Sequence, residues 1–494
     1  MNADLADRSA QDLIADVQAR KVSIREVVAA CLARIEQVDG VVNAVCTKSP
    51  VALTDAEAAD RRLASGAPLR RLEGVPFLVK DVIPTRGLLT TYGSKLHETF
   101  VPDEDAISVA RLRAAGAILL GKTNTPEFAT DVYTTNALFG PTRNPWDART
   151  TAGGSSGGSG AAVAAGMAPL ALGTDFGGSV RLPAAFCGIV GLRPAPGRIP
   201  LYPAEFAWDT LVAHVHGPMT RTVEDAALMF AVLTGPDDRD PASLPLDSAD
   251  YVAAGRPRTG LAGRRFAWCG DLGGLVPVEP EIAQIVGNAA HALEDLGAIV
   301  DDVAFDASDL KDIIAGTRAF AMVARFGERV EAHGAQMAEP LVRQVTDARG
   351  FDVKAVARAE RMRSAYYQRL RVLLERYDHV LTPTAGVPAF RIDRPLPTEI
   401  AGRPVARFYD TFLFTYAFSV TGLPVISVPC GFTRAGLPVG LQIVGRRLRE
   451  DSVLEAAAAM AAAAPEHFRR PPLESLPSPR ELGENLRTTG FSLT

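Results

Sequence analysis

The chain has 494 residues, of which 47% are hydrophobic and 22% are charged, and its formal net charge is −5. This balance is typical of a soluble globular protein and lacks the basic excess of a nucleic-acid-binding protein. No apolar run reaches the roughly 18 residues that a membrane span needs, and the acidic start MNADLADRSAQDL has no apolar signal core. We therefore expect a cytoplasmic protein with neither a nucleic-acid nor a membrane partner.

Two amphipathic helices are predicted at the N-terminus, within residues 9–38. Ser9 begins the first, and Ser23 begins the second, where Glu26 completes a capping box. We interpret both helices as scaffold. A short strand, VVNAVC, and a charged surface helix, DAEAADRRLA, are predicted next.

The run VPFLVKDVI is predicted to be a strand buried on both faces, because it is almost continuously apolar. Lys80 and Asp81 interrupt it. The lysine could pair with Asp81 at the strand end, or it could be a general base, because desolvation lowers the pKa of an ammonium group. Residue chemistry alone leaves both interpretations open.

Residues 105–120 predict a helix ending near Gly116 and then a buried strand, followed by the polar loop GKTNTPEF. Residues 116–123 match the Walker A pattern literally. The predicted strand lies between the two glycines of that pattern instead of before the first, which argues against a phosphate-binding loop.

Residues 151–181, TAGGSSGGSGAAVAAGMAPLALGTDFGGSVR, place Ser155 and Ser179 among glycines. Glycine permits positive φ and a close approach of backbone to ligand, so each serine could present its hydroxyl to a substrate. The small residues between them are compatible with a packed helix and a buried strand. Residues 153–157 also fit G-x-S-x-G, but the preceding NPWDARTTA does not have the pattern of the strand that this motif requires.

The second half of the chain predicts a mixture of helices and strands. VGLRPAPGRIP is expected to be an irregular surface segment because of its prolines and glycines, and residues 236–265 a long connection. FAWCGDL, EIAQIVGNAAHALEDLG and AIVDDV predict a strand–helix–strand unit, and residues 308–377 are helix-rich. There follow the strand VLTPTAG, the aromatic helix FYDTFLFTYAFSVTG, a hairpin of PVISVPCGF with PVGLQIVGR, and the helix DSVLEAAAAMAAAA.

Metal binding has little support. His214 and His216 alternate in LVAHVHG and could share one strand face, but no third ligand is close in sequence. The five cysteines are scattered without a CxxC pair, so we expect free thiols. No metal is therefore expected.

The run GGSSGGSGAAVAAG, continued by LALGTDFGGSVRLPAAFCGIVGLRP, resembles the signature of the amidase signature family. VPFLVKD, GKTNTPEF, TRNPWD, GPMTRTVEDAAL, LPVISVPCGF and GLPVGLQIVG resemble its other blocks in the same order. The resemblance spans roughly residues 10–460 and is weakest between about 236 and 400.

The fold that this resemblance implies is a single α/β/α domain over residues 1–465, with a large central mixed β-sheet flanked by helices. Its signature core would cover about residues 70–235, and a helix-rich substrate-side region about 308–377. Residues 466–494 would form a polar, proline-containing tail.

The resemblance also implies a Ser-Ser-Lys triad, whose members fall on Lys80, Ser155 and Ser179. Ser179 would attack an amide carbonyl while Ser155 passes its proton to a neutral Lys80, and water would release the resulting acyl-enzyme. The peptide bond Gly154–Ser155 would be cis, and no cofactor would be needed. This resemblance favours the general-base interpretation of Lys80.

Further residues around the nucleophile receive roles from the same resemblance. The oxyanion would be held by the backbone N–H groups of Phe176, Gly177, Gly178 and Ser179. Asp175 and Arg181 would support this loop as a charge pair.

Ala129, Thr130 and Asp131 correspond by position to a loop that lines the acyl site of the family. Phe176 stands where many members have a small polar residue, so the pocket wall is expected to be bulkier and more apolar. The aromatic helix, with Phe408, Tyr409, Phe412, Phe414, Tyr416 and Phe418, could line the leaving-group side or belong to the core.

The leading hypothesis is an amidohydrolase that cleaves a linear carboxylic amide to a carboxylate and ammonia or an amine. The glutaminase component of a glutamine-dependent tRNA amidotransferase resembles the chain in the same blocks, but its helical block with a glutamine-binding arginine is not evident before the helix at 351–377. An esterase with the same triad and a catalytically silent scaffold are further alternatives. The natural amide is not readable from the sequence, and a homodimer is left open.

Overall fold

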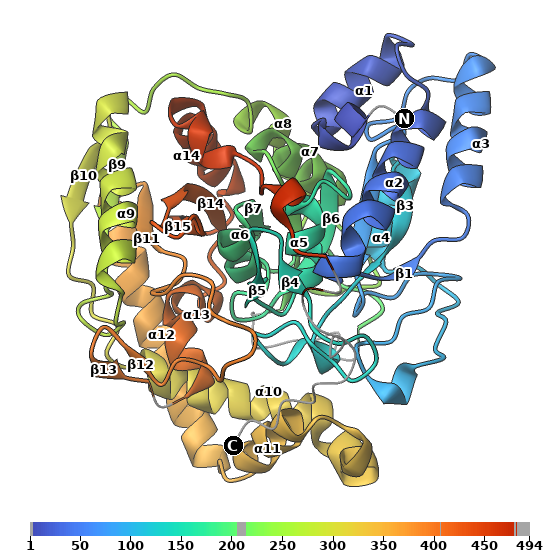
Figure 1. Ribbon diagram of the computed structural model, residues 1–494. Helices are drawn as coiled ribbons and strands as arrows, with labels where there is room; N and C mark the ends of the chain where they lie inside the picture. Colours follow the sequence, from blue (N-terminus) through green and yellow to red (C-terminus); the bar gives the residue numbers. More distant parts are fainter. Residues whose placement is uncertain (1–2, 205–213, 406, 479–480, 482–494) are drawn as a thin grey trace.

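The computed structural model describes residues 3–204, 214–405, 407–478 and 481. Within them, eleven strands form one mixed sheet with helices on both of its faces (Figure 1). The predicted α/β architecture is therefore confirmed, whereas the predicted domain boundaries stay a prediction. No described helix is long and apolar enough to cross a membrane.

The order of the strands across the large sheet differs strongly from their order in the chain. Parallel pairing joins β2 to β3 and β6, and joins β9 to β10 and β11, while the central pairs are antiparallel. Across the sheet, the strands are β1 (Val45–Lys48), β3 (Ile118–Thr123), β2 (Pro76–Lys80), β6 (Leu170–Asp175), β8 (Val215–Thr220), β7 (Val190–Arg193), β14 (Val425–Phe432), β15 (Pro438–Gly445), β11 (His379–Pro383), β9 (Arg265–Trp268) and β10 (Ile299–Asp302).

Strand β2 is buried on both faces, as its apolar run predicts. Phe77 and Val79 belong to one hydrophobic cluster and Leu78 to another, because successive side chains of a strand point to opposite faces. The chain therefore builds a core on each side of the sheet, and Lys80 ends a strand that lies between them.

The first two α-helices begin at the capping residues that the sequence predicts. The Ser9 side chain accepts a hydrogen bond from the Asp12 N–H, and Ser23 and Glu26 form the predicted capping box. The helices are α1 (Ala10–Gln18), α2 (Ile24–Val42), α3 (Ala52–Ala64), α4 (Ile107–Ala114), α5 (Gly157–Ala164), α6 (Arg181–Cys187), α7 (Val223–Leu233), α8 (Tyr251–Ala254), α9 (Pro280–His291), α10 (Leu310–His333), α11 (Glu339–Ala348), α12 (Val353–Arg376), α13 (Leu413–Ser419) and α14 (Glu450–Ala463).

Three expectations about local structure are wrong. NPWDARTTA contains the strand β5 (Asp147–Thr151), which pairs with β4 (Arg143–Asn144) outside the main sheet. The start of VGLRPAPGRIP is not an irregular surface segment but the buried strand β7. This strand forms backbone hydrogen bonds with β14 on one side and β8 on the other. The strand β3 extends through Thr123 into the predicted loop GKTNTPEF.

A second small hairpin lies outside the main sheet and joins β12 (Glu399–Ile400) to β13 (Arg403–Pro404).

Candidate active site

The side chain of Lys80 lies fully buried at the end of β2 and contacts two hydroxyl groups. Its Nζ donates hydrogen bonds to Ser155 Oγ at 2.6 Å and to Thr174 Oγ1 at 2.8 Å. Thr174 is on the neighbouring strand β6, and Ser155 follows a cis peptide bond with Gly154, as the resemblance implies. Sequence reasoning missed Thr174, although it stands directly before Asp175 in the signature run.

Burial sets the protonation of Lys80. Loss of solvent lowers the pKa of the Lys80 amine well below its ordinary value, and the charge of Asp175 opposes this only in part. The hydroxyls of Ser155 and Thr174 carry no charge that would hold a proton on the amine. A neutral amine in hydrogen-bond contact with a serine hydroxyl is the arrangement that a general base requires.

Asp81 is not the partner of Lys80. The Asp81 Oδ2 accepts a hydrogen bond from the Thr91 N–H at 3.0 Å, and the cation that acts on the pKa of Asp81 is Lys122. Burial raises the pKa of Asp81 to about 6, although Lys122 opposes the shift. The pairing of Lys80 with Asp81, which the sequence left open, is therefore not what the structure shows.

Lys122 is a second buried lysine, one strand away on β3. Its Nζ donates to the Ile83 carbonyl, to Thr85 Oγ1 at 2.9 Å and to Thr90 Oγ1 at 3.1 Å. These contacts hold the segment after β2 in place. The two buried lysines thus differ in their surroundings, because only Lys80 contacts a serine of the signature run.

Asp175 organises the loop that carries Ser179. It accepts hydrogen bonds from the N–H groups of Gly178 at 2.9 Å and Val180 at 3.1 Å, and it forms ion pairs with Arg181 at 2.9 Å and Arg193 at 3.4 Å. Burial alone would raise the pKa of Asp175, but the two guanidinium groups outweigh it and lower that pKa to about 2. The expected charge pair between Asp175 and Arg181 is present, and Arg193 extends it.

The glycines of this loop are required by close packing. A Cβ on Gly177 would lie 2.2 Å from the Tyr416 ring, and one on Gly178 would lie 2.3 Å from Thr415 Oγ1. Gly178 also has a φ of +133°, which side-chain-bearing residues rarely adopt. The loop before Ser179 therefore packs directly against α13.

The backbone donors near Ser179 are not equivalent. The N–H of Gly178 is directed at Asp175, which contradicts the expectation that it binds an oxyanion. Within the described part of the chain, no hydrogen bond engages the N–H of Phe176, Gly177 or Ser179, and all three residues line a cavity. Of the four predicted donors, these three therefore remain candidates for binding a substrate.

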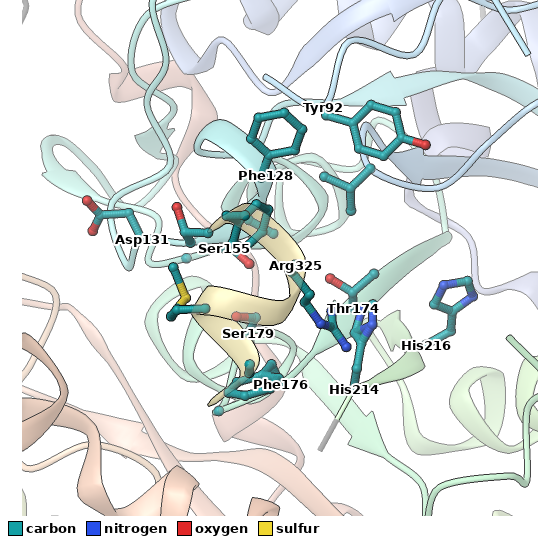
Figure 2. Close-up of a pocket in the computed structure, with 18 of the residues that line it drawn as sticks. Tyr92, Phe128, Asp131, Ser155, Thr174, Phe176, Ser179, His214, His216 and Arg325 are labelled. Atoms are coloured by element: carbon teal, nitrogen blue, oxygen red, sulfur yellow. The ribbon is translucent and has the colours of Figure 1, made fainter. Parts of the chain in front are cut away.

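That cavity has a volume of about 360 Å³ and contains both Ser155 and Ser179 in its wall (Figure 2). This volume is adequate for a small organic substrate. The residues that sequence reasoning assigned to the pocket all line it: Ala129, Thr130, Asp131, Phe176, Gly177 and Gly178. The hydroxyls of Ser155 and Ser179 are not hydrogen-bonded to each other, and catalytic hydrogen bonds often tighten only when substrate binds.

The aromatic helix divides between cavity and core. Phe412 and Tyr416 line the cavity, whereas Phe414 and Phe418 are fully buried in a hydrophobic cluster. This helix thus contributes some residues to the cavity and others to the core, as the alternation of faces along a helix requires. A place on the leaving-group side stays a prediction.

His214 and His216 also line the cavity, but the structure gives them no metal-binding partner. His216 Nδ1 lies 2.8 Å from Ser108 Oγ, and among the described residues there is no group of three side chains able to hold a metal ion. Burial lowers the pKa of His216 to about 3 and that of His214 well below its ordinary value. Both imidazoles are therefore neutral at physiological pH.

Two sets of residues in the cavity lining were not assigned from the sequence, although the helix-rich region 308–377 was expected on the substrate side. One is an aromatic wall, with Tyr92, His97, Phe100 and Phe128. The other is a face of α10 with Arg318, Arg325 and Arg329. The spacing of these arginines by seven and four residues is a helical signal, but the sequence does not reveal which side of α10 meets the site.

Comparison with known proteins gives consistent matches along the chain. A family model described as Amidase matches residues 26–454. The A subunit of the glutamyl-tRNA(Gln) amidotransferase of Moorella thermoacetica is 38% identical, with 92% of this chain and 96% of the relative covered. An acylamidase of Rhodococcus erythropolis is 36% identical, with 94% and 97% covered.

Solved structures agree in fold. A bacterial aryl acylamidase of the amidase signature family superposes with a TM-score of 0.87 at 32% identity, covering 93% of this chain and 97% of that one. The A subunit of the glutamyl-tRNA(Gln) amidotransferase of Thermotoga maritima gives a TM-score of 0.74 at 29% identity, covering 96% and 98%.

Proposed function

Because the chain belongs to the amidase signature family, we propose that it hydrolyses a linear carboxylic amide to a carboxylate and ammonia or an amine, without a cofactor. The observation that carries this proposal is the 2.6 Å contact between the buried Lys80 amine and the Ser155 hydroxyl, at the edge of a cavity that contains Ser179. A serine alone is too weak a nucleophile for an amide and needs an adjacent base.

In the proposed mechanism Ser179 Oγ attacks the carbonyl carbon. Ser155 takes the proton of Ser179 and gives its own proton to the neutral Nζ of Lys80. When the tetrahedral intermediate collapses, the proton returns from Lys80 through Ser155 to the departing nitrogen, which leaves an acyl ester on Ser179. Water, deprotonated through the same two groups, then hydrolyses the ester and restores Ser179.

The oxyanion of each intermediate would accept hydrogen bonds from among the N–H groups of Phe176, Gly177 and Ser179. One such donor contributes about 3–4 kcal/mol to lowering the barrier in a comparable site. Asp175, held by Arg181 and Arg193, would fix the loop so that these donors keep their direction. Its role is positional, because its carboxylate is occupied by the loop and the two arginines.

The second candidate is the glutaminase component of a tRNA-dependent amidotransferase, because relatives with that name are as similar in sequence as the acylamidase. The TM-score of 0.87 with the aryl acylamidase, against 0.74 with the Thermotoga maritima protein, favours the independent amidohydrolase. Glutaminase activity together with co-purification of a second type of chain would reverse this preference.

The proposal is tested by incubating the purified protein with a panel of aryl and aliphatic amides and their matching esters. The wild type is expected to release carboxylate from amides, and Ser179→Ala and Lys80→Ala are expected to abolish this release. Ser159→Ala is the matched control, because Ser159 stands in the same glycine-rich run but contacts Thr123. If Ser179→Ala and Lys80→Ala turn over every substrate as the wild type does, the assignment of the triad is wrong. If the wild type cleaves the esters but none of the amides, the protein is an esterase.

A further inference from the structure

His216 is a buried histidine of β8 whose imidazole lies between α4 and the cavity. The residue is 7% exposed, it lines the cavity, and its Nδ1 lies 2.8 Å from Ser108 Oγ of α4. Across the sheet it pairs with Thr174 (Figure 2), whose hydroxyl accepts a hydrogen bond from Lys80. A single strand, β6, therefore separates this histidine from the strand of the proposed base.

The contact with Ser108 determines which nitrogen of His216 carries the proton. Ser108 is fully buried, and among the described residues its hydroxyl has one hydrogen-bond partner, Nδ1 of His216. A buried hydroxyl has one proton to donate and needs an acceptor for it, so Ser108 Oγ donates to Nδ1. Burial also lowers the pKa of His216 to about 3, so the ring carries a single proton at neutral pH. That proton is therefore on Nε2.

The Nε2–H of His216 has no acceptor in the part of the chain that the structure describes. The neighbouring imidazole of His214 makes a T-shaped contact with a distance of 6.2 Å between ring centroids, which is too far for a hydrogen bond. N–H groups as buried as this one are almost always hydrogen-bonded. Because His216 lines the cavity, a molecule in the cavity can supply the acceptor.

The neighbourhood of Lys80 favours an uncharged acceptor at this place. Thr174, the partner of His216 across the sheet, lies 2.8 Å from Nζ of Lys80, and the proposed mechanism needs that amine to be neutral. A carboxylate bound at His216 would raise the pKa of Lys80 and hold a proton on the amine. An ammonium group would offer no lone pair to the donor. An ether or carbonyl oxygen accepts a hydrogen bond without adding charge.

We propose that His216 is a specificity-determining residue whose Nε2–H binds an uncharged ether or carbonyl oxygen of the substrate, in addition to the scissile amide. Ser108 is the positioning residue that keeps the proton on Nε2. The inference rests on the proposed amidohydrolase function and specifies its substrate class, namely amides that carry a second, uncharged oxygen acceptor. Amides with a methylene group in place of that oxygen would bind more weakly, because they leave the N–H of His216 without an acceptor.

Two pairs of isosteric substrates test this proposal, with the oxygen on either side of the amide. The p-nitroanilide of 3-methoxypropionic acid is compared with that of pentanoic acid, and 3-methoxyacetanilide with 3-ethylacetanilide. In each pair a methylene group replaces one ether oxygen. Without a donor in the cavity the methylene member should be preferred, because its binding removes no polar atom from water. In at least one pair we expect the ether to have a kcat/KM roughly 3- to 10-fold higher, the range for one hydrogen bond between uncharged groups.

His216→Phe keeps a flat ring but has no N–H, so it should lower the ratio of ether to methylene substrate to one or below. His216→Gln, which keeps an N–H donor, should retain part of the preference. Ser108→Ala should weaken it, and Ser108→Thr, which keeps the hydroxyl, should preserve it. His291→Phe is the matched control, since the side chain of His291 on α9 is 41% exposed. A wild-type ratio of one or less in both pairs, or a ratio that His216→Phe leaves intact, would overturn the inference.

The position of the proton can be measured directly by nitrogen NMR of protein labelled with ¹⁵N-histidine, in which His216→Gln identifies the signals of this ring. At neutral pH we expect a protonated Nε2 and an unprotonated Nδ1, and Ser108→Ala should allow both tautomers. A wild-type ring protonated on Nδ1 would overturn the inference. If His216→Phe does not fold, Ser108→Ala and the wild-type ratios decide.

Failure of the inference can be told apart from failure of the proposed function. Cleavage of these anilides that depends on Ser179, without preference for the ethers, would refute the role of His216 and leave the amidohydrolase in place. If no amide is turned over, the proposed function fails, and calorimetry on Ser179→Ala decides the binding question. There, the ether of at least one pair should bind more tightly than its methylene partner, and equal or weaker binding of both ethers would overturn the inference.

Discussion

The amine of Lys80 lies 2.6 Å from the hydroxyl of Ser155, although 75 residues separate the two in the chain. The contact joins the end of β2 to the segment before α5, and Thr174 of the neighbouring strand β6 completes it. The proposed base and its two hydroxyl partners therefore come from three separate segments of the chain. A substitution in one segment leaves the sequence of the other two unchanged.

Lys80→Met should abolish amidase activity while preserving the fold. Methionine fills a similar volume but cannot accept a proton, and loss of a general base typically costs roughly 10²- to 10⁴-fold in rate. The measurement is kcat/KM on whichever amide the wild type cleaves, together with the thermal midpoint. Activity retained in a well-folded Lys80→Met protein would contradict the proposed role.

Lys122→Met should show the opposite behaviour and mainly reduce stability. It removes the cation that acts on the buried Asp81 and leaves the Ile83 carbonyl without its donor, so about 1–3 kcal/mol of unfolding free energy should be lost. Lys80→Met strands no carboxylate in this way and serves as the matched comparison in urea denaturation. Equal stability losses in the two variants would show that the two lysines are not distinguished by their partners.

The rate of amide hydrolysis should rise with pH and then level off. The neutral amine is the active form, and because the pKa of Lys80 is lowered, deprotonation occurs at a lower pH than in free lysine. We therefore expect the rise to lie well below the pH at which an exposed lysine titrates. His214 and His216 do not titrate there, since burial lowers their pKa values. A kcat that rises only at the pH where an exposed lysine loses its proton, with chemistry limiting, would contradict the role of Lys80.

Gly177→Ala should inactivate the protein, because its Cβ would lie 2.2 Å from the Tyr416 ring and displace the loop before Ser179. The double variant Gly177→Ala/Tyr416→Ala removes the clash and should recover part of the activity. Gly287→Ala is the control, because the added methyl group there has its nearest contact at 3.9 Å. Loss of kcat in the single variant without recovery in the double one would show that the clash is not the cause.

The sequence predicts a structural feature well when the residues that determine the feature are close together in the chain. Lys80, Ser155 and Ser179 stand in short, distinctive blocks, so they could be identified together with the cavity residues 129–131. Individual strands could be anticipated from buried apolar runs such as the one in β2, whereas the large mixed sheet was implied by the family resemblance. The strand β7 could not, because two neighbouring strands override the proline and glycine content that predicts irregular structure.

The arginines of α10 that line the cavity show a second limit of prediction from the sequence. Arg318, Arg325 and Arg329 lie where the family resemblance is weakest, and their spacing is equally compatible with a solvent-exposed face of α10. Which face meets the cavity is decided by packing against other helices, namely the following helices α11 and α12 and the more distant α13. The Gly178 N–H could not be assigned for the same reason, because its acceptor depends on how the loop folds around Asp175.

Thr174 and Asp175 are adjacent on β6, and their side chains serve opposite ends of the proposed chemistry: the hydroxyl meets Lys80, and the carboxylate meets Arg181. Side chains alternate along a strand, so a slip of β6 by one residue would exchange the two. The lysine would then face a carboxylate and keep its proton, and the loop of Ser179 would lose its anchor. The register of β6 against β8, in which Thr174 pairs with His216, therefore also determines that Lys80 faces a hydroxyl and can act as the base.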